Sequence, residues 1–144
     1  MGTAIINAWA PLAVLLIIGV AVYLFARFRL RALPNVPSVL VGPADAITIA
    51  REKNYNAVLR TFKVLIDGVV VGEIGVGEVK NFRTGAGRHT VAVKIDWCTS
   101  RPLSVQKKEH ANLPLRCGAT YEGLRALFTA FVKTRDYVYV RSDG

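Results

Sequence analysis

The sequence predicts a mainly β protein: a single N-terminal transmembrane helix, then a small antiparallel β-sandwich with a short amphipathic helix near the C-terminus. Three observations support this fold class. The first 26 residues carry no charge, the chain from position 46 alternates apolar and polar residues, and Asp67-Gly68 separates two β-prone runs. We therefore divide the 144 residues into a membrane helix over 1–26, a juxtamembrane linker over 27–45 and a sandwich domain over 46–144.

The N-terminal segment has the length and composition of a membrane span. No residue from Ala4 to Ala26 is charged, and Leu12 to Phe25 is almost entirely aliphatic or aromatic. A helix of this length measures roughly 34 Å, enough to cross a hydrocarbon core of about 30 Å. Trp9 and Tyr23 lie near its two ends, where amphipathic rings favour the headgroup level. A core helix would show a polar face and a signal peptide would begin with basic residues, so we expect a spanning helix.

Basic residues set the expected orientation. Arg27, Arg29 and Arg31 follow the apolar run, and all 19 Lys and Arg residues lie at or after position 27. Because positive charge is retained on the cytoplasmic side, the N-terminus is expected outside and the C-terminal domain inside. This predicts a single-pass protein of the bacterial inner (cytoplasmic) membrane, with these arginines fixing the depth of the helix.

The net charge of +9 belongs entirely to the part after the apolar run. Such a domain is attracted to anionic lipids, by about 1 kcal/mol for each well-placed basic residue. Nucleic acid could use the same charge, but the basic residues are interspersed with apolar strand residues and form no recognition-helix pattern. We therefore expect anionic lipids, and no nucleic acid, among the partners.

The linker contains prolines that end the helix and favour an extended chain. We expect it to lie along the membrane or against a partner. Beyond it, Asp67-Gly68 is a strong hairpin signal, because type I′ turns need positive φ at both central residues. Val91, Val93 and Ile95 alternate toward the core, and Trp97 is expected to continue that face. The expected strands fall within 46–49, 62–66, 69–74, 79–83, 90–97, 103–106, 113–116 and 137–140.

The segment 123–132 differs from its surroundings because its apolar residues repeat at helical spacing. It is too short to span a bilayer. We expect an amphipathic helix that packs either on the sandwich or in the headgroup layer.

The residues that could carry chemistry are few and scattered. Cys98 and Cys117 are 19 positions apart, and His89 and His110 are 21 apart, so neither pair has zinc-ligand spacing. Both cysteines are expected to be small core residues, reduced in the cytoplasm. No nucleophile–base pair or phosphate loop is evident. We expect no cofactor, no metal, no small-molecule substrate and no enzymatic activity.

Several motifs carry a resemblance to a known kind of domain. They are Phe62–Gly68, Val71–Ile74, Gly77-Glu78, Gly87–Val91, Ile95–Cys98 and Cys117-Gly118, followed by Tyr137–Val140. Over about residues 46–140 the chain is similar to PEGA-like or carboxypeptidase-regulatory-like β-sandwich modules. The resemblance implies a non-catalytic interaction or spacer module.

These observations lead to two main hypotheses. In the first, the chain is an accessory or assembly subunit of a larger membrane complex. Its helix packs through Ala13, Gly19 and Ala21, where small side chains permit close approach. Photosynthetic and respiratory complexes are examples, and the H subunit of purple-bacterial reaction centres is an architectural analogy. In the second, the chain is a free-standing tethered adaptor that binds anionic lipid or a soluble protein through its basic face. A regulatory subunit of a cell-envelope enzyme is a further alternative.

Overall fold

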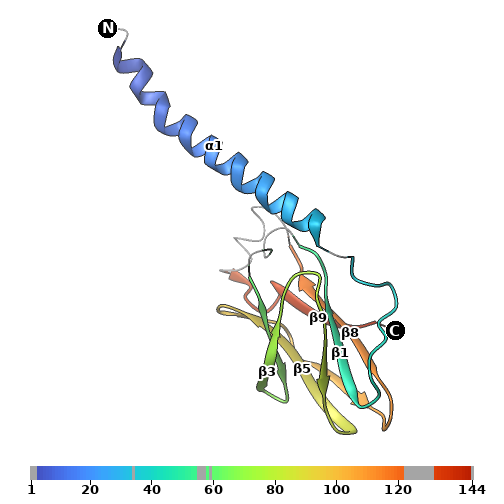
Figure 1. Ribbon diagram of the computed structural model, residues 1–144. Helices are drawn as coiled ribbons and strands as arrows, with labels where there is room; N and C mark the ends of the chain where they lie inside the picture. The colour runs from blue at the N-terminus through green and yellow to red at the C-terminus, as the bar shows by residue number, and fades with distance from the viewer. Residues whose placement is uncertain (1–2, 34, 55–57, 59, 122–131, 144) are drawn as a thin grey trace.

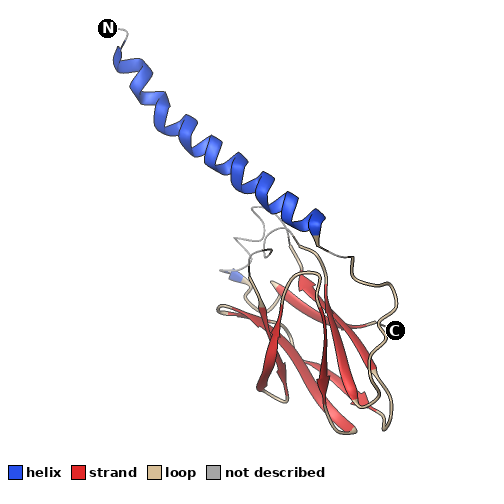
Figure 2. Cartoon of the chain, viewed as in Figure 1, coloured by secondary structure: helices blue, strands red, loops and turns tan. Residues whose placement is uncertain are grey.

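The computed structural model describes residues 3–33, 35–54, 58, 60–121 and 132–143. One long helix leads into a sandwich of two β-sheets (Figures 1 and 2). Helix α1 spans Thr3–Ala32, and its part from Trp9 to Ala32 is long and apolar enough to cross a membrane. It continues beyond the predicted boundary at Ala26, because charged side chains end an apolar run without ending a helix. No proline or glycine interrupts the chain between Gly19 and Ala32.

Among the described residues, nine strands form the two sheets. The first has the order β4-β1-β8-β9, with β1 at Ala46–Arg51, β4 at Val79–Arg83, β8 at Leu113–Ala119 and β9 at Val138–Ser142. The second has the order β3-β2-β5, with β3 at Val69–Ile74, β2 at Phe62–Ile66 and β5 at Gly87–Ile95. Two short strands, β6 at Cys98–Thr99 and β7 at Leu103–Lys107, both pair with β5.

The predicted antiparallel sandwich is corrected at one strand pair. Strands β1 and β8 run parallel, with Ile47 opposite Leu113 and Arg51 opposite Cys117. The other pairings are antiparallel among the strands described. Hairpin signals report only neighbours in sequence, so they could not indicate a pairing between strands more than 60 positions apart.

The directions of the paired strands define two ends of the sandwich. Strands β1, β3, β5 and β8 run toward the end from which the helix emerges (Figure 1). This helix-proximal end carries residues 52–54, 75–78, 96–97 and 100–102. The opposite, far end carries Asp45 and the turns at 67–68, 84–86 and 108–112.

The core lies between the sheets and follows the predicted alternation. Phe62, Val64 and Ile66 are buried on one face of β2, while Lys63 between them is exposed. Strands β1, β2, β3, β5, β6, β8 and β9 contribute the buried core residues, which are Ile47, Ile49, Phe62, Val64, Ile66, Ile74, Val91, Val93, Ile95, Cys98, Leu115, Cys117, Val138 and Val140. Both sheets therefore contribute apolar side chains to one continuous interior.

The predicted Asp67-Gly68 hairpin is confirmed. Asp67 and Gly68 have φ angles of 52° and 80°, as the type I′ turn requires. The prediction that Trp97 lies in the core is wrong, because its side chain is 58% exposed. Ile95 pairs directly with Cys98, so the chain reverses at Asp96-Trp97 and the inward alternation stops at Ile95.

The C-terminal part is described only from Val132 onward. Residues 122–131 lie outside the described part, so the amphipathic helix expected over 123–132 stays a prediction. The strand expected at 137–140 is confirmed as β9, which pairs with β8 from Ala119 opposite Val138 to Leu115 opposite Ser142.

Candidate functional site

The basic end of helix α1 holds a belt of aromatic and arginine side chains. Arg27 Nη1 donates a hydrogen bond of 3.2 Å to the Tyr23 hydroxyl, and the Arg29 guanidinium lies 5.5 Å from the centre of the Phe25 ring. Arg31 is also exposed. At the other end of the span, Trp9 is 68% exposed. The structure thus brings Tyr23 and Arg27 together, an arrangement suited to an interface between hydrocarbon and headgroups.

The three small residues proposed for helix packing are all exposed, but they do not share one face. At about 100° per residue, Gly19 lies roughly 120° from Ala13 and 160° from Ala21 around the helix. The heptad partners of Gly19 are Leu12 and Ala26. A close helix–helix approach at Gly19 would therefore involve these two residues.

The chain between helix and sandwich, residues 35–45, is called the strap here. It lies over the outer face of β1, and this explains why Thr48 is buried although it faces away from the core. A Cβ added to Gly42 would stand 1.9 Å from Thr48 Oγ1, so the strap lies directly on the strand. The Thr48 hydroxyl in turn lies 2.7 Å from Asn81 Oδ1 and 2.6 Å from Asn112 Oδ1. The strap packs on its own domain, whereas the sequence suggested the membrane or a partner.

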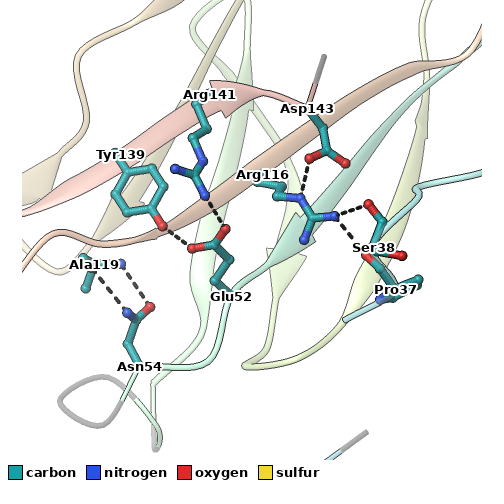
Figure 3. Close-up of polar contacts among 9 residues, drawn as sticks. All are labelled: Pro37, Ser38, Glu52, Asn54, Arg116, Ala119, Tyr139, Arg141 and Asp143. Atoms are coloured by element: carbon teal, nitrogen blue, oxygen red, sulfur yellow. Dashed lines mark hydrogen bonds and ion pairs between the residues drawn. The ribbon is translucent and has the colours of Figure 1, made fainter. Parts of the chain in front are cut away.

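Side chains of the sandwich bind both the strap and the helix end, and Figure 3 shows the contacts of Arg116 with the strap. Arg116 Nη2 donates hydrogen bonds of 2.8 Å to the carbonyl oxygens of Pro37 and Ser38, and its Nε pairs with Asp143. The pair is largely sheltered, with 13% and 18% of the two side chains exposed. The bond from Arg116 lowers the pKa of Asp143. These contacts fix the middle of the strap to β8.

Lys53 fastens the point where the helix ends. Its Nζ donates a hydrogen bond of 2.6 Å to the carbonyl oxygen of Leu33 and one of 2.9 Å to Asn35 Oδ1. Leu30, in the last turn of the helix, is 6% exposed. The helix end and the sandwich are therefore in direct contact.

A polar network joins the segment after β1 to β8 and β9 (Figure 3). Asn54 exchanges two hydrogen bonds with the backbone of Ala119, at 3.0 and 3.2 Å, as a neighbouring strand would. The Glu52 carboxylate accepts hydrogen bonds from the Tyr139 hydroxyl and from Arg141. Burial, and then the bond to Glu52, raise the pKa of Tyr139, so it stays protonated and donating. A Cβ on Gly118 would stand 2.7 Å from that hydroxyl.

Arg51 closes the helix-proximal end of the sandwich. It is fully buried, and its guanidinium stacks 3.6 Å from the centre of the Phe62 ring. Its Nη1 donates hydrogen bonds to the carbonyl oxygens of Arg60, at 2.5 Å, and Ile74, at 3.0 Å. Burial lowers its pKa to about 10, so the side chain remains charged at neutral pH. Arg51 therefore ties the β1 sheet to the ends of β2 and β3.

The cysteines lack the character of reactive thiols. Both are buried and reduced, and burial raises the pKa of Cys117 to about 12 and raises that of Cys98. Neither is a thiolate at neutral pH, so neither has the form that attacks electrophiles or binds metals. Within the described ranges, no three His, Cys, Asp or Glu residues are grouped as metal ligands would be.

His89 and Asp67 form an ion pair at the far end. The ring Nδ1 lies 2.7 Å from Asp67 Oδ2, and Nε2 lies 3.0 Å from the Gly85 carbonyl oxygen. With an acceptor at each ring nitrogen, the doubly protonated imidazole is favoured. The pKa of His89 is accordingly raised and that of Asp67 lowered, first by the bond between them. This pair joins two turns, a structural role.

The helix-proximal end carries a second group of charged residues, next to exposed Trp97. A cavity of about 670 Å³ beside the tryptophan is lined by residues including Arg101 and Arg135. Arg101 Nε also donates a 2.9 Å hydrogen bond to Asp136. On the adjoining sheet face a smaller cavity is lined by Arg60, Thr61, Lys63, Lys94 and Asp96. We call Trp97, Arg60, Lys63, Lys94, Arg101 and Arg135 the basic rim.

Sequence reasoning missed the fastening residues and the rim. Arg51 had a usable signal, since Ile47, Ile49 and Arg51 alternate inward and the arginine takes the last core position of β1. Arg116 and Lys53 had none, because they bind the backbone carbonyl groups of Pro37, Ser38 and Leu33, and a carbonyl group is offered by every residue. The family models, curated proteins and solved structures with which the chain was compared gave no match.

Proposed function

We propose that this chain is a non-catalytic accessory subunit of a larger membrane complex, with its helix packed among partner helices and its sandwich capping the cytoplasmic side. The similarity to PEGA-like modules belongs to the same proposal, since such modules mediate interactions or act as spacers. Three observations support this proposal: the strap bound to the sandwich, the apolar surface of helix α1 and the exposed valines of β3. The bound strap is the main one.

The hydrogen bonds that hold the strap favour a subunit with a fixed position over a domain on a flexible linker. A flexible linker lets a domain search a volume that grows with linker length. Here Arg116 holds the carbonyl groups of Pro37 and Ser38, while Lys53 holds that of Leu33. These bonds leave the sandwich little freedom to move relative to the helix. A domain held in this way suits a fixed position in an assembly.

The surface of helix α1 also supports partners within the membrane. Leu15, Leu16, Ile17 and Ile18 are consecutive and point in four directions, yet each is more than half exposed. An apolar surface on all sides needs lipid or other helices around it. Gly19 leaves open space where its side chain would be, since nothing lies within 4 Å of an added Cβ. Partner helices approach closely at such positions.

Strand β3 presents an apolar edge on the sandwich. Val69, Val70 and Val71 are 66%, 52% and 42% exposed, and β3 ends the order of its sheet. Native proteins usually cover or charge such an edge to prevent unwanted strand pairing. A partner subunit on the cytoplasmic side would cover it.

The first experiment is purification of the tagged full-length chain in mild detergent, followed by mass spectrometry of the proteins recovered with it. We expect a stoichiometric set of membrane proteins. Gly19→Ile should remove that set, because the added side chain separates the helices. Ala10→Ile is the matched control, since it adds the same side chain about 180° away around the helix, at an exposed position that is not assigned to packing. Recovery of the wild-type chain alone, still folded, would contradict the subunit role.

Orientation needs a separate test. Lys108 is exposed at the far end, and the native cysteines are buried, so Lys108→Cys gives one reactive thiol on the sandwich. We expect a membrane-impermeant maleimide to label it only after the cells are permeabilised. Labelling in intact cells would place the domain outside and overturn the cytoplasmic assignment.

The basic rim favours a second candidate, a tethered adaptor that binds anionic lipid without a protein complex. The adaptor and subunit hypotheses predict different results. If the chain is an adaptor, the wild-type chain would purify alone, and removing the charges of the basic rim would alter only its binding to lipid.

A further inference from the structure

The cavity beside Trp97 has the composition of a site for an anion at a membrane surface. It measures about 670 Å³, and Trp97, Ser100, Arg101, Pro102 and Arg135 are among its lining residues. Arg101 and Arg135 bring two guanidinium groups, whose planar donors match phosphate oxygens. Trp97 brings an amphipathic ring, and tryptophan is enriched at the level between headgroups and hydrocarbon.

The depth of the helix end places this cavity at the headgroup layer. From Arg27, at the edge of the apolar run, to Ala32 the helix rises about 8 Å. A headgroup layer is roughly 5–8 Å thick on each side of the hydrocarbon. Arg29 and Leu33 line a shared cavity with Val76 and Glu78 of the β3–β4 turn, so that turn meets the helix end.

The β5–β6 turn, which carries Trp97, belongs to the same helix-proximal end (Figure 1). The fastened strap keeps this end close to the bilayer whenever the helix spans it.

We propose that the cavity lined by Trp97, Arg101 and Arg135 binds the phosphate of an anionic phospholipid headgroup, docking the sandwich on the membrane. The inference rests on the proposed membrane span, but it does not require a partner subunit. Arg101 and Arg135 donate to the phosphate oxygens, and the Trp97 ring lies at the level of the glycerol backbone.

Charge around the cavity favours an anionic surface as the occupant. Lys63 and Lys94 lie directly opposite each other on β2 and β5, a pairing of like charges that destabilises a sheet. Arg60 is nearby, where it pairs with Asp96. The basic rim thus has five cations near three carboxylates: Asp96, Asp136 and Glu73, which lies opposite Lys63. An array of lipid phosphates offsets this excess along the whole rim.

Lipid is favoured over a protein partner because the rim is continuous with the membrane anchor. Arg27, Arg29 and Arg31 lie at the end of the span where the sandwich begins. The rim lies at the end of the sandwich that meets the helix end, where Lys53 binds the Leu33 carbonyl oxygen. No diffusional search is needed for the headgroups, since the span itself holds them at high local concentration. Docking then requires only modest intrinsic affinity.

The two tryptophans allow a direct test on the full chain. Trp9→Phe leaves Trp97 as the only tryptophan, and Trp97→Phe leaves Trp9. Each variant is reconstituted into nanodiscs of phosphatidylcholine alone or with about 30% phosphatidylglycerol, with brominated acyl chains as quenchers. Trp9 fluorescence reports the span, and Trp97 fluorescence reports the docking. We expect quenching of Trp97 to be at least about 2-fold stronger with the anionic lipid and to fall in high salt.

Charge reversal then tests the site itself. In the Trp9→Phe background, Arg101→Glu with Arg135→Glu should reduce Trp97 quenching at least about 2-fold. Arg83→Glu with Arg88→Glu is the matched control, because it makes the same charge change near the far end and should leave quenching unchanged. Hydrogen exchange of β2 and β5 in each variant checks that the sandwich is folded.

Two results would overturn docking. One is Trp97 fluorescence that brominated lipid does not quench, while Trp9 fluorescence is quenched. That result would refute the lipid contact of the sandwich and leave the membrane span unaffected. The other is equal loss of quenching in both charge-reversal pairs, which would mean attraction by net charge without a site. Loss of quenching on adding free inorganic phosphate at millimolar concentration, without high salt, would mean that phosphate competes with the headgroup for the cavity and would support the site. Absence of Trp9 quenching would instead refute the span.

Discussion

Arg116, on strand β8, donates a hydrogen bond of 2.8 Å to the carbonyl oxygen of Ser38, 78 positions earlier in the chain. The same guanidinium holds the Pro37 carbonyl oxygen and pairs with Asp143. We expect Arg116→Ala to destabilise the sandwich by about 2–3 kcal/mol, because hydrogen bonds to a charged group are lost and Asp143 is left unpaired. Hydrogen exchange should rise over residues 35–45.

The control for this prediction is Arg101→Ala. Its ion pair with Asp136 is exposed, with 78% of the arginine side chain accessible, so we expect a change within about 1 kcal/mol. Unchanged exchange over the strap in Arg116→Ala would mean that packing of the strap on β1 holds it without the arginine.

Gly118 is required by the position of Tyr139. A methyl group there would stand 2.7 Å from the tyrosine hydroxyl and 3.1 Å from Asn54 Oδ1. We expect Gly118→Ala to displace Tyr139 from Glu52 and to cost about 1–3 kcal/mol in thermal unfolding experiments. Gly85→Ala is the matched control, since an added Cβ meets nothing within 4 Å. Equal melting temperatures for the two variants would contradict the steric argument.

The His89–Asp67 pair makes stability depend on pH. The pKa of His89 is raised, so its contribution is complete below about pH 6.5 and is lost as the pH rises through the folded-state pKa. The pKa of Asp67 is lowered, so its contribution is lost only in acid, as the pH falls through the folded-state value. We expect the melting temperature of the wild type, relative to His89→Gln, to decrease between about pH 6 and 8.5. A difference that stays constant across this range would refute the ion pair.

The cysteines should resist thiol reagents in the folded chain. The pKa of Cys117 is raised to about 12 and that of Cys98 is also raised, and both side chains are buried. We expect slow reaction with Ellman's reagent at pH 8 and rapid reaction of both thiols after denaturation. Rapid labelling of one thiol without denaturant would show that the sandwich opens locally around it.

Features that depend on the chemistry of a few neighbouring residues could be predicted from the sequence. Asp67-Gly68 predicted its hairpin because Gly adopts positive φ freely and Asp tolerates it, and the φ angles of both residues in the structure are positive. The apolar run predicted a helix able to span a membrane, although the helix extends to Ala32 because no helix breaker follows Arg27 at once.

Features that depend on distant partners could not be predicted. Trp97 was expected inside because alternation was extended by one step, whereas the pairing of Ile95 with Cys98 reverses the chain first. The parallel pairing of β1 with β8 has no local signal. The hydrogen bonds from Arg116 and Lys53 have no local signal either, because every residue offers a backbone carbonyl group. Only the tertiary fold selects those of Pro37, Ser38 and Leu33.

The route of the strap decides how mechanical load would pass through the molecule. The chain leaves the helix-proximal end and follows the outer face of the sheet to Asp45 at the far end, before β1 returns toward the helix. Tension on the helix therefore first loads the bonds of Lys53 and Arg116, and these break one after another as the strap peels. Strand β1, between β4 and β8, is loaded only after the strap has come away. Under such a load the strap would lengthen before the strands of the sandwich carry the force.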